Sequence, residues 1–267
     1  MRALKLLFYA LFAVFTMTAL CACGSDEPDP VEEPEAGTSK VDKVNPKLIY
    51  KAGLPKTING GMVKLDSKNR ISAIGDYTFE YIERPSESTE ADVIVKDDNE
   101  VEYEIWLNDD GLAERIVQGR LADFSIKYDE NKAPTNVDYT IKEYGETYTF
   151  SVRISYSHGN ASRVVEENED GVSSGEYKYS HVENLGGYPV VLTGDFSIIF
   201  FTGMLGKSSA YLPEKAEIIS VDYVTTESES YDMTYSYKFN PKGLPLSVTR
   251  TSLEEDYPET DIITYTW

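Results

Sequence analysis

Cysteine, histidine and basic residues are scarce in this chain of 267 residues. Two cysteines and two histidines are too few for a disulfide scaffold or for a metal centre built on Cys and His ligands. Only 25 lysines and arginines stand against 46 acidic residues, so the formal net charge is −21. A nucleic-acid binder needs a basic footprint, which this balance excludes. We therefore expect no nucleic-acid partner, no bound metal and no cofactor.

The one long hydrophobic run without charge near the amino terminus spans residues 6–20 and follows the basic residues Arg2 and Lys5. It is shorter than the ~20 residues of a membrane-spanning helix and typical of a secretory signal peptide. The run ends in Leu20, Cys21, Ala22 and Cys23, which resembles the bacterial lipobox. We therefore expect residues 1–22 to be removed and Cys23 to be the lipid attachment site. The alternative is an ordinary secretory peptide with two incidental cysteines.

A polar, acidic segment separates the expected lipid site from the folded part. Residues 23–45 are rich in Pro and Glu near their start and lack apolar periodicity, which indicates a solvated tether. Ser25, Asp26 and Glu27 resemble the acidic surface-export signal of Bacteroidetes lipoproteins, although a generic spacer would also read this way. A triacylated cysteine anchors a protein stably to a membrane. We expect an outer-membrane lipoprotein that faces the cell exterior, with one folded domain at residues 46–267.

The body of the chain has a period of two. Aromatic and aliphatic residues alternate with polar ones over residues 148–156 and 231–239, as in strands that bury one face. Asn or Asp followed by Gly recurs between such segments, as at residues 108–111 and 240–243, and predicts hairpin turns. The pattern predicts an all-β fold, an antiparallel meander of roughly a dozen strands.

One apolar stretch breaks this alternation. Residues 194–206 (GDFSIIFFTGMLG) place apolar side chains around most of a helix, with Asp195 as the N-cap. A helix apolar on nearly all sides has to be enclosed. The meander is therefore predicted to curl into a barrel or half-barrel around one apolar helix at about residues 195–212. A pair of buried strands is the alternative for this stretch.

Three segments resemble a known family: residues 51–60 (KAGLPKTING), residues 201–213 (FTGMLGKSSAYLP), and residues 239–245 with the closing Tyr-Thr-Trp. They are similar to a Bacteroidetes outer-membrane lipoprotein family of unknown function with a porin-like fold. The resemblance covers about residues 47–267 and implies a barrel-like body without a known activity. A transmembrane pore is not favoured, because an enclosed apolar helix requires an apolar interior, whereas transmembrane barrels are apolar outside.

Two motifs suggest chemistry but have simpler interpretations. Residues 171–175 (GVSSG) match the nucleophile-elbow pattern but lack its strand-to-helix context, so we interpret them as a hairpin turn. Glu166, Asn168 and Asp170 approach a calcium loop, yet Tyr177 stands where a bidentate Glu is needed. With no catalytic residues to name, we expect a non-enzymatic binding or envelope-interaction module. The alternatives are a carrier of a lipid or other hydrophobic ligand in the barrel interior and a carboxylate-dependent hydrolase acting on glycans. Protein partners cannot be named from the sequence.

Overall fold

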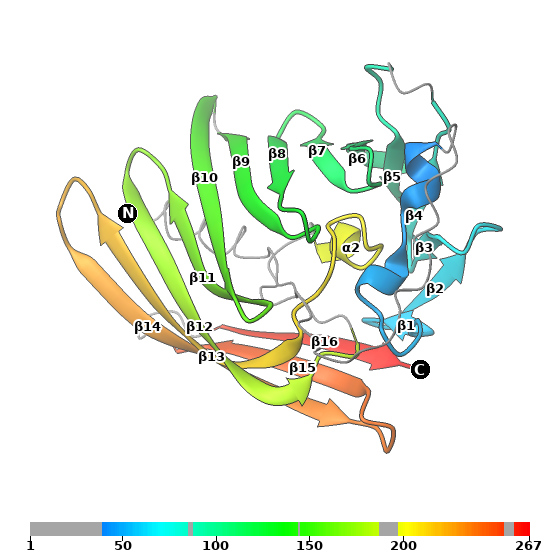
Figure 1. Ribbon diagram of the computed structural model, residues 1–267. Helices are drawn as coiled ribbons and strands as arrows, with labels where there is room; N and C mark the ends of the chain where they lie inside the picture. Colours follow the sequence, from blue (N-terminus) through cyan, green and yellow to red (C-terminus); the bar gives the residue numbers. More distant parts are fainter. Residues whose placement is uncertain (1–38, 85–87, 144, 187–196, 254–258) are drawn as a thin grey trace.

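The computed structural model describes residues 39–84, 88–143, 145–186, 197–253 and 259–267. The expected signal peptide, Cys23 and most of the tether lie outside the described residues, as do Asp195 and the start of the expected helix. In the described part, sixteen antiparallel strands form one closed barrel, β1 pairing with β16 (Figure 1). The predicted all-β barrel is confirmed, with more strands than the dozen expected.

The barrel strands follow one another around the ring in sequence order. They are β1 (Thr57–Ile58), β2 (Gly61–Leu65), β3 (Ile71–Ile74), β4 (Tyr77–Tyr81), β5 (Val93–Asp97), β6 (Glu100–Leu107), β7 (Ala113–Gln118), β8 (Ala122–Tyr128), β9 (Pro134–Glu143), β10 (Glu146–Ser157), β11 (Asn160–Glu167), β12 (Gly171–Glu183), β13 (Tyr211–Asp222), β14 (Ser228–Phe239), β15 (Pro245–Ser252) and β16 (Thr260–Thr266). Short 3-10 helices, η1 (Lys40–Lys43) and η2 (Pro46–Leu48), precede β1, and one helical turn, α2 (Ser197–Phe200), lies between β12 and β13.

The alternation read from the sequence sets which side chains face inward. In β10, Phe150, Val152 and Ile154 are buried, while Arg153 between them is exposed. The inward residues of β14, Met233 and Tyr235, follow the same rule. Because side chains of a strand point alternately to the two faces of the sheet, the apolar set of each strand lines the interior.

The Asn-x-x-Gly turns have the geometry that their sequence predicts. Gly111 and Gly243 have φ of 75° and 77°. In each turn the Asn side chain, Asn108 or Asn240, accepts hydrogen bonds from backbone N–H groups two and four residues later. In the related turn after β8, the residue with a positive φ is Lys132 (63°), which follows Asn131.

The turns alternate between the two ends of the barrel because neighbouring strands are antiparallel. One end, called here the terminal end, carries the turns at residues 66–70, 108–112 and 240–244 together with the amino-terminal segment and the last residue of β16. The other end, called the far end, carries the turns at residues 59–60 and 75–76, between β1 and β2 and between β3 and β4.

The ring closes through a short seam between β1 and β16. Two residues of β1 pair with Thr266 and Tyr265. The seam is extended by the backbone bond from Lys56 N–H to the Thr266 carbonyl, 2.7 Å, and from Asn59 N–H to the Thr264 carbonyl, 2.8 Å. It therefore joins the two ends of the folded part of the chain.

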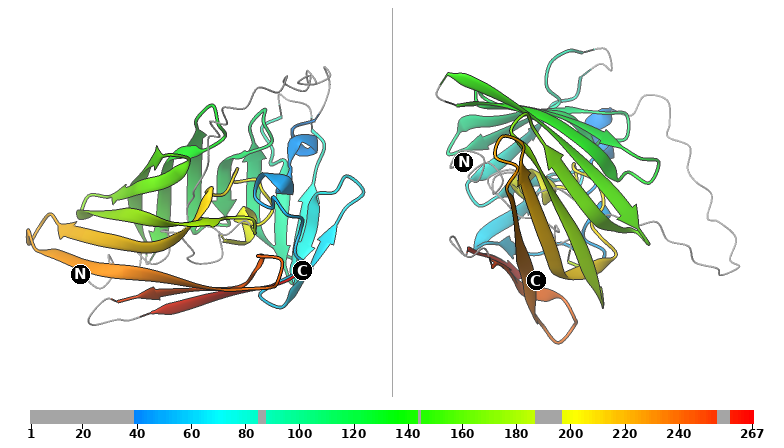
Figure 2. Two further views of the ribbon diagram at one scale, coloured as in Figure 1. Left: turned by 60° about the horizontal axis from the view of Figure 1, so that its bottom comes forward. Right: turned by 90° about the vertical axis from the view of Figure 1, so that its left-hand side faces the viewer.

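The interior is filled by the connection between β12 and β13. Residues 197–209 of this connection, called here the plug, lie inside the ring, shown in yellow in Figures 1 and 2. Ile199, Phe200, Phe201, Met204 and Leu205 are each at most 1% exposed. The predicted enclosure of this apolar stretch by the sheet is confirmed.

The predicted helix at about residues 195–212 is wrong in its extent. Of the described residues in this range, from 197 onward, only α2 is helical, and the chain then turns repeatedly before β13 begins at Tyr211. Gly203 and Gly206 have φ of 82° and 93°, which an α-helix excludes. An added Cβ at Gly203 would lie 2.5 Å from the Asn45 carbonyl oxygen. The glycines thus turn the plug and let it approach the amino-terminal segment.

The amino-terminal segment joins the plug in the core. Val41, Val44, Ile49 and Tyr50 are nearly fully buried, so the packed part of the chain includes residues before Asn45. Ser208 of the plug donates its hydroxyl to the Ile49 carbonyl over 3.3 Å. Segments far apart in the sequence therefore fill the barrel together.

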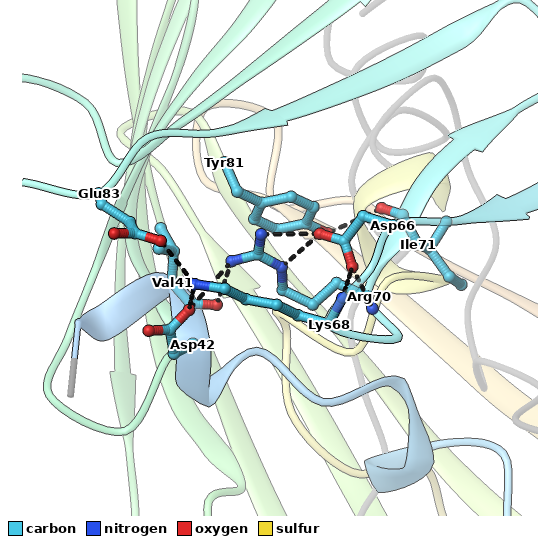
Figure 3. Close-up of polar contacts among 8 residues, drawn as sticks. All are labelled: Val41, Asp42, Asp66, Lys68, Arg70, Ile71, Tyr81 and Glu83. Carbon is cyan, nitrogen blue, oxygen red and sulfur yellow. Dashed lines mark hydrogen bonds and ion pairs between the residues drawn. The ribbon is translucent and has the colours of Figure 1, made fainter.

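A polar clamp, the network of Asp42, Asp66, Lys68, Arg70 and Tyr81, holds η1 against the barrel (Figure 3). Arg70, only 7% exposed, pairs with Asp66 at 2.7 Å and donates to the Val41 carbonyl at 3.0 Å. Its guanidinium lies 4.2 Å from the centre of the Tyr81 ring. Burial opposes ionisation of Asp66, but hydrogen bonds from Arg70 and Lys68 outweigh it and hold the pKa of Asp66 below its ordinary value. The clamp fixes the start of the folded domain at the terminal end.

Candidate functional site

A cavity of about 780 Å³ lies at the far end of the barrel, between the first hairpins and the plug. This volume falls within the range of small-molecule sites, roughly 300–1,000 Å³. Its lining residues are Ile58, Asn59, Gly60, Gly61, Met62, Ile74, Gly75, Asp76, Tyr77, Asp97, Ile198 and Phe201. They come from the turns and ends of β1 to β5 and from the plug, so the cavity exists only because the barrel has closed around the plug.

The cavity combines apolar and acidic groups. Ile58, Ile74 and Phe201 are nearly fully buried side chains at its base, and Ile198 is half-buried. Asp76 and Asp97 come from the β3–β4 turn and the end of β5. Among the described residues, neither carboxylate has a side-chain hydrogen bond or ion pair. Because the three apolar side chains at the base are at most 3% exposed, the site offers a ligand mainly hydrogen-bond acceptors, with some apolar surface from Ile198.

The wall next to the seam is held by backbone contacts. Asn59, at φ 51°, accepts the Thr264 N–H on its side-chain oxygen at 2.9 Å, which orients its amide. Gly61 and Gly75 bring two hairpins together: an added Cβ at Gly61 would lie 2.9 Å from the backbone of Gly75. Side chains at these glycines would force the hairpins apart, so the shape of the cavity depends on them.

A second polar group lies inside the barrel wall rather than in the cavity. Glu166 of β11 is 4% exposed and accepts a 2.5 Å hydrogen bond from the hydroxyl of Tyr139. The Tyr139 ring is stacked between Phe124 and Phe150, with ring centres 5.4 and 4.6 Å away. Burial raises the pKa of Glu166 to about 7, against the Tyr139 hydrogen bond, which lowers it. Its other oxygen, Oε2, has no partner in the described part of the chain.

The calcium-loop and nucleophile-elbow patterns of this region, which the sequence already disfavours, correspond to a turn and the start of a strand. Glu166 points into the barrel, and Asn168 caps the turn by accepting the Asp170 and Gly171 N–H groups. Residues 171–175, expected as a hairpin turn, are the first residues of β12, and the turn precedes them. The hydroxyl of Ser173 is bound to Ser220 at 2.8 Å. Among the described residues no group of three or more His, Cys, Asp or Glu is arranged to hold a metal.

The sequence contained one unused signal for Glu166: it follows Val164 at a spacing of two, on the inward face. The sequence contained no such signal for Asp76 and Asp97, because acidic residues are common in and near turns. Only the closure of the ring brings these two residues beside the plug.

The outer face of the barrel carries charged side chains in ion pairs, together with scattered exposed apolar residues such as Val101, Ile219 and Ile262. Cross-strand ion pairs join Lys96 to Glu80, Arg115 to Asp123, Arg153 to Glu167 and Lys215 to Asp232, at 2.6–2.7 Å. A transmembrane barrel instead presents an apolar band outward, where a midplane Lys or Arg costs about 2–4 kcal/mol. Within the described ranges, no helix has the length and apolar character needed to span a membrane.

The fold and its filled interior define a class: closed antiparallel barrels with the shape of a porin and a solid core. The chain belongs to the family described as a domain of unknown function (DUF4595) with porin-like fold, whose model matches residues 58–247. The resemblance seen in the sequence is thereby confirmed, over a shorter range than residues 47–267.

A solved structure from Bacteroides uniformis shows the same fold. A porin-like protein from Bacteroides uniformis is 17% identical, with a TM-score of 0.53, and the match covers 77% of this chain and 89% of that one. A porin-like protein from Bacteroides vulgatus is 13% identical, with a TM-score of 0.48 and coverage of 80% and 99%. No functionally curated protein matches the chain.

Proposed function

We propose that this protein is a lipid-anchored outer-membrane lipoprotein, facing the cell exterior, that acts as a non-enzymatic binding module. The observation that carries the binding role is the cavity at the far end, lined by two carboxylates that have no side-chain partner among the described residues. The porin-like family supports an envelope location. The amino-terminal segment lies at the terminal end, so a tether leaving it starts at the end of the barrel away from the cavity.

The anchor is tested by changing the proposed acylation site. Cys23→Ala moves the protein from the membrane to the soluble fraction, because the net-acidic body has no other means of staying on an anionic bilayer. Cys21→Ala is the matched control, since this residue leaves with the signal peptide. Continued membrane retention of Cys23→Ala contradicts the anchor. Protease treatment of intact cells tests surface exposure separately: a protected protein faces the periplasm.

Ligand binding is tested on protein purified from its native cells. Solvent extraction and mass spectrometry are expected to find a stoichiometric small molecule that is lost in Ile198→Trp, whose larger side chain occupies the cavity, and retained in Ile198→Val. A co-purified lipid favours the carrier alternative, for which Ile198 would supply part of the apolar surface. A ligand retained unchanged in Ile198→Trp contradicts binding in this cavity.

A screen for hydrolytic activity tests the proposed non-enzymatic role. A carboxyl with a pKa of about 7, such as Glu166, suits a general acid at neutral pH. Its 4% exposure supports a structural role instead, because a substrate has to reach a general acid. Glycan and ester substrates are expected to remain unchanged. Hydrolysis that disappears in Glu166→Gln establishes the hydrolase alternative.

A further inference from the structure

The acidic and basic residues of this chain are unevenly distributed over the barrel. Residues 43–65 and 233–253 together contain seven lysines and no Asp or Glu, although the formal net charge of the chain is −21. We propose that the terminal end of the barrel docks on an anionic lipid surface through these lysines. This inference rests on the lipid anchor of the proposed function, since it concerns which end of the anchored barrel faces the membrane.

The seam brings the two stretches together. Residues 43–65 run from the end of η1 to the end of β2, residues 233–253 cover the second half of β14 and all of β15, and only β16 separates β15 from β1 (Figure 1). The Lys56 ammonium donates to the Trp267 carbonyl at 2.7 Å, and the Trp267 indole donates to the Pro245 carbonyl at 2.7 Å. The exposed lysines of the two stretches, called here the lysine patch, are Lys47, Lys51, Lys56, Lys64, Lys238 and Lys242. They lie before β1 or next to the turns after β2 and β14, so all of them belong to the terminal end.

Acidic residues are concentrated away from the lysine patch. The far-end turns at residues 97–100, 167–170 and 222–229 contain nine Asp and Glu and no Lys or Arg. At the terminal end, the acidic turns at residues 108–112 and 129–133 adjoin β6 to β9, across the ring from the seam. An anionic surface therefore attracts the seam side of the terminal end and repels the far end.

The acidic residues close to the patch are already paired. Glu183 pairs with Lys51 at 3.7 Å, and Asp66 in the turn after β2 pairs with Arg70 at 2.7 Å. Four patch lysines form no ion pair within the described ranges of the chain: Lys47, Lys64, Lys238 and Lys242. An anionic partner can therefore contact these lysines without breaking an existing ion pair.

Exposed apolar side chains accompany the lysine patch. Leu65 directly follows Lys64 at the end of β2, and Phe239 directly follows Lys238 at the end of β14. Leu246 lies at the start of β15, and all three apolar side chains are 38–44% exposed. A lysine keeps its ammonium group among lipid head groups while neighbouring apolar side chains enter the boundary with the acyl chains. An anionic lipid surface thus uses both properties of this end, whereas a small soluble anion such as phosphate would leave the apolar residues unused.

The path of the chain brings this end to the bilayer. The described part begins at Ser39, directly before η1, and Cys23 lies 16 positions earlier in the sequence. A segment of this length spans at most about 55 Å, so a lipid on Cys23 keeps the terminal end within reach of the membrane. Such tethering raises the local concentration, and a contact that is weak in solution becomes populated. The patch thus orients the anchored barrel, but it does not retain the net-acidic protein once the lipid is removed.

The test imposes the anchor chemically, which makes it independent of acylation in the cell. The chain from Cys23 onward contains a single cysteine, through which it is coupled to maleimide lipids in vesicles of phosphatidylcholine, alone or with about one-third phosphatidylglycerol. Acetylation of each lysine is followed by mass spectrometry. At low salt, we expect the patch lysines to react about three times more slowly on the anionic vesicles than on the neutral ones, while Lys142 at the far end reacts equally on both. At about 500 mM salt the difference should disappear, because exposed charges are then screened over a few ångströms.

Variants locate the contact on the barrel. Each lysine near an anionic leaflet strengthens binding about five-fold, so Lys47→Gln with Lys242→Gln is expected to return Lys64 to its rate on neutral vesicles. Lys127→Gln with Lys142→Gln, two exposed lysines of β8 and β9, is the matched control for the loss of charge and leaves the protection of Lys64 unchanged. Circular dichroism checks that both double variants are folded.

The outcomes separate the orientation of the barrel from the anchor itself. Equal acetylation of the patch lysines on neutral and anionic vesicles overturns docking on anionic lipid. Protection of Lys64 that persists in the variant lacking Lys47 and Lys242 also overturns it, because the contact is then not made through the patch. Stronger protection of Lys142 than of the patch shows that the far end faces the membrane. None of these results bears on acylation, which Cys23→Ala tests separately by membrane retention in cells.

Discussion

Removal of the buried carboxyl of Glu166 is expected to change how stability depends on pH. The pKa of Glu166 is about 7 in the folded protein, and a Glu in an unfolded chain titrates near 4.3. The folded state therefore holds an extra proton between these values, and the free energy of unfolding falls as pH rises from about 4.5 to about 7. At about 1.4 kcal/mol per pKa unit, the loss over the whole range is about 4 kcal/mol, of which about 3 kcal/mol falls above pH 5.

Glu166→Gln keeps the acceptor for the Tyr139 hydroxyl and abolishes the titration. At pH 5 the neutral Glu and the Gln each bury a donor at the unpartnered Oε2 position, so the two proteins have similar stabilities. At pH 8 the wild type carries the cost of a buried charge, and Glu166→Gln is expected to be more stable by about 3 kcal/mol. Urea unfolding followed by tryptophan fluorescence at pH 5, 6, 7 and 8 measures the difference.

The neighbouring residue provides the matched control. Glu167 lies on the outer face, paired with Arg153 and bound by the Tyr223 hydroxyl at 2.8 Å. Glu167→Gln is expected to leave the slope of stability against pH unchanged from pH 5 to 8. Parallel profiles for the wild type and Glu166→Gln over this range would refute the argument from burial.

Three further changes test the packing, each with a matched control in unfolding experiments. Gly203→Ala lowers the free energy of unfolding by about 3 kcal/mol, because it combines a positive φ with a clash against Asn45. Gly243→Ala, at nearly the same φ but with nothing within 4 Å of the added Cβ, costs about 1 kcal/mol. Equal losses in the two variants would contradict the contact with Asn45. Tyr177→Phe removes a buried hydroxyl that has no partner among the described residues, and it stabilises the protein by about 1 kcal/mol. Tyr179→Phe removes a hydroxyl that donates to the Ala161 carbonyl, and it destabilises the protein by a similar amount. The reverse order would show that the Tyr177 hydroxyl is hydrogen-bonded in solution. Arg70→Ala costs about 3 kcal/mol, because in the half-buried clamp Asp66 loses its ion pair and the Val41 carbonyl loses the guanidinium hydrogen bond. The exposed counterpart Arg115→Ala also loses an ion pair and a ring contact but costs less than about 1 kcal/mol. Similar losses in the two variants would mean that burial of the clamp contributes nothing.

The strands and turns were predictable because their causes are local. A period of two identifies a half-buried strand without knowledge of its neighbours, and Asn108 and Gly111 encode a turn within four residues. For the plug, the sequence predicted burial, because an apolar composition requires enclosure. It did not predict the path of the backbone. Its path depends on Gly203, and the reason for that glycine is the Asn45 carbonyl, more than 150 positions away in the chain. A local pattern cannot report such a contact.

The candidate site is non-local in the same way. Asp76 and Asp97 are ordinary turn residues in the sequence, and Ile198 belongs to a segment that reaches them only through the fold. Glu166 was grouped with an incomplete calcium-loop pattern in an acidic turn, but its position in the alternation places it inside. The cluster of acidic residues indicated the correct turn, but it did not indicate that Glu166 of β11 faces the interior.

The seam between β1 and β16 sets the order in which this molecule is completed. The hydroxyls of Thr57 and Thr266, 209 positions apart in sequence, meet at 2.8 Å across it. A chain that emerges amino terminus first therefore stays an open sheet with two unpaired edges until β16 is released. A truncation that removes the last strand would leave those edges exposed permanently, and it would open the wall that carries Asn59, so assembly of the ring and the capacity to hold a ligand would be lost together.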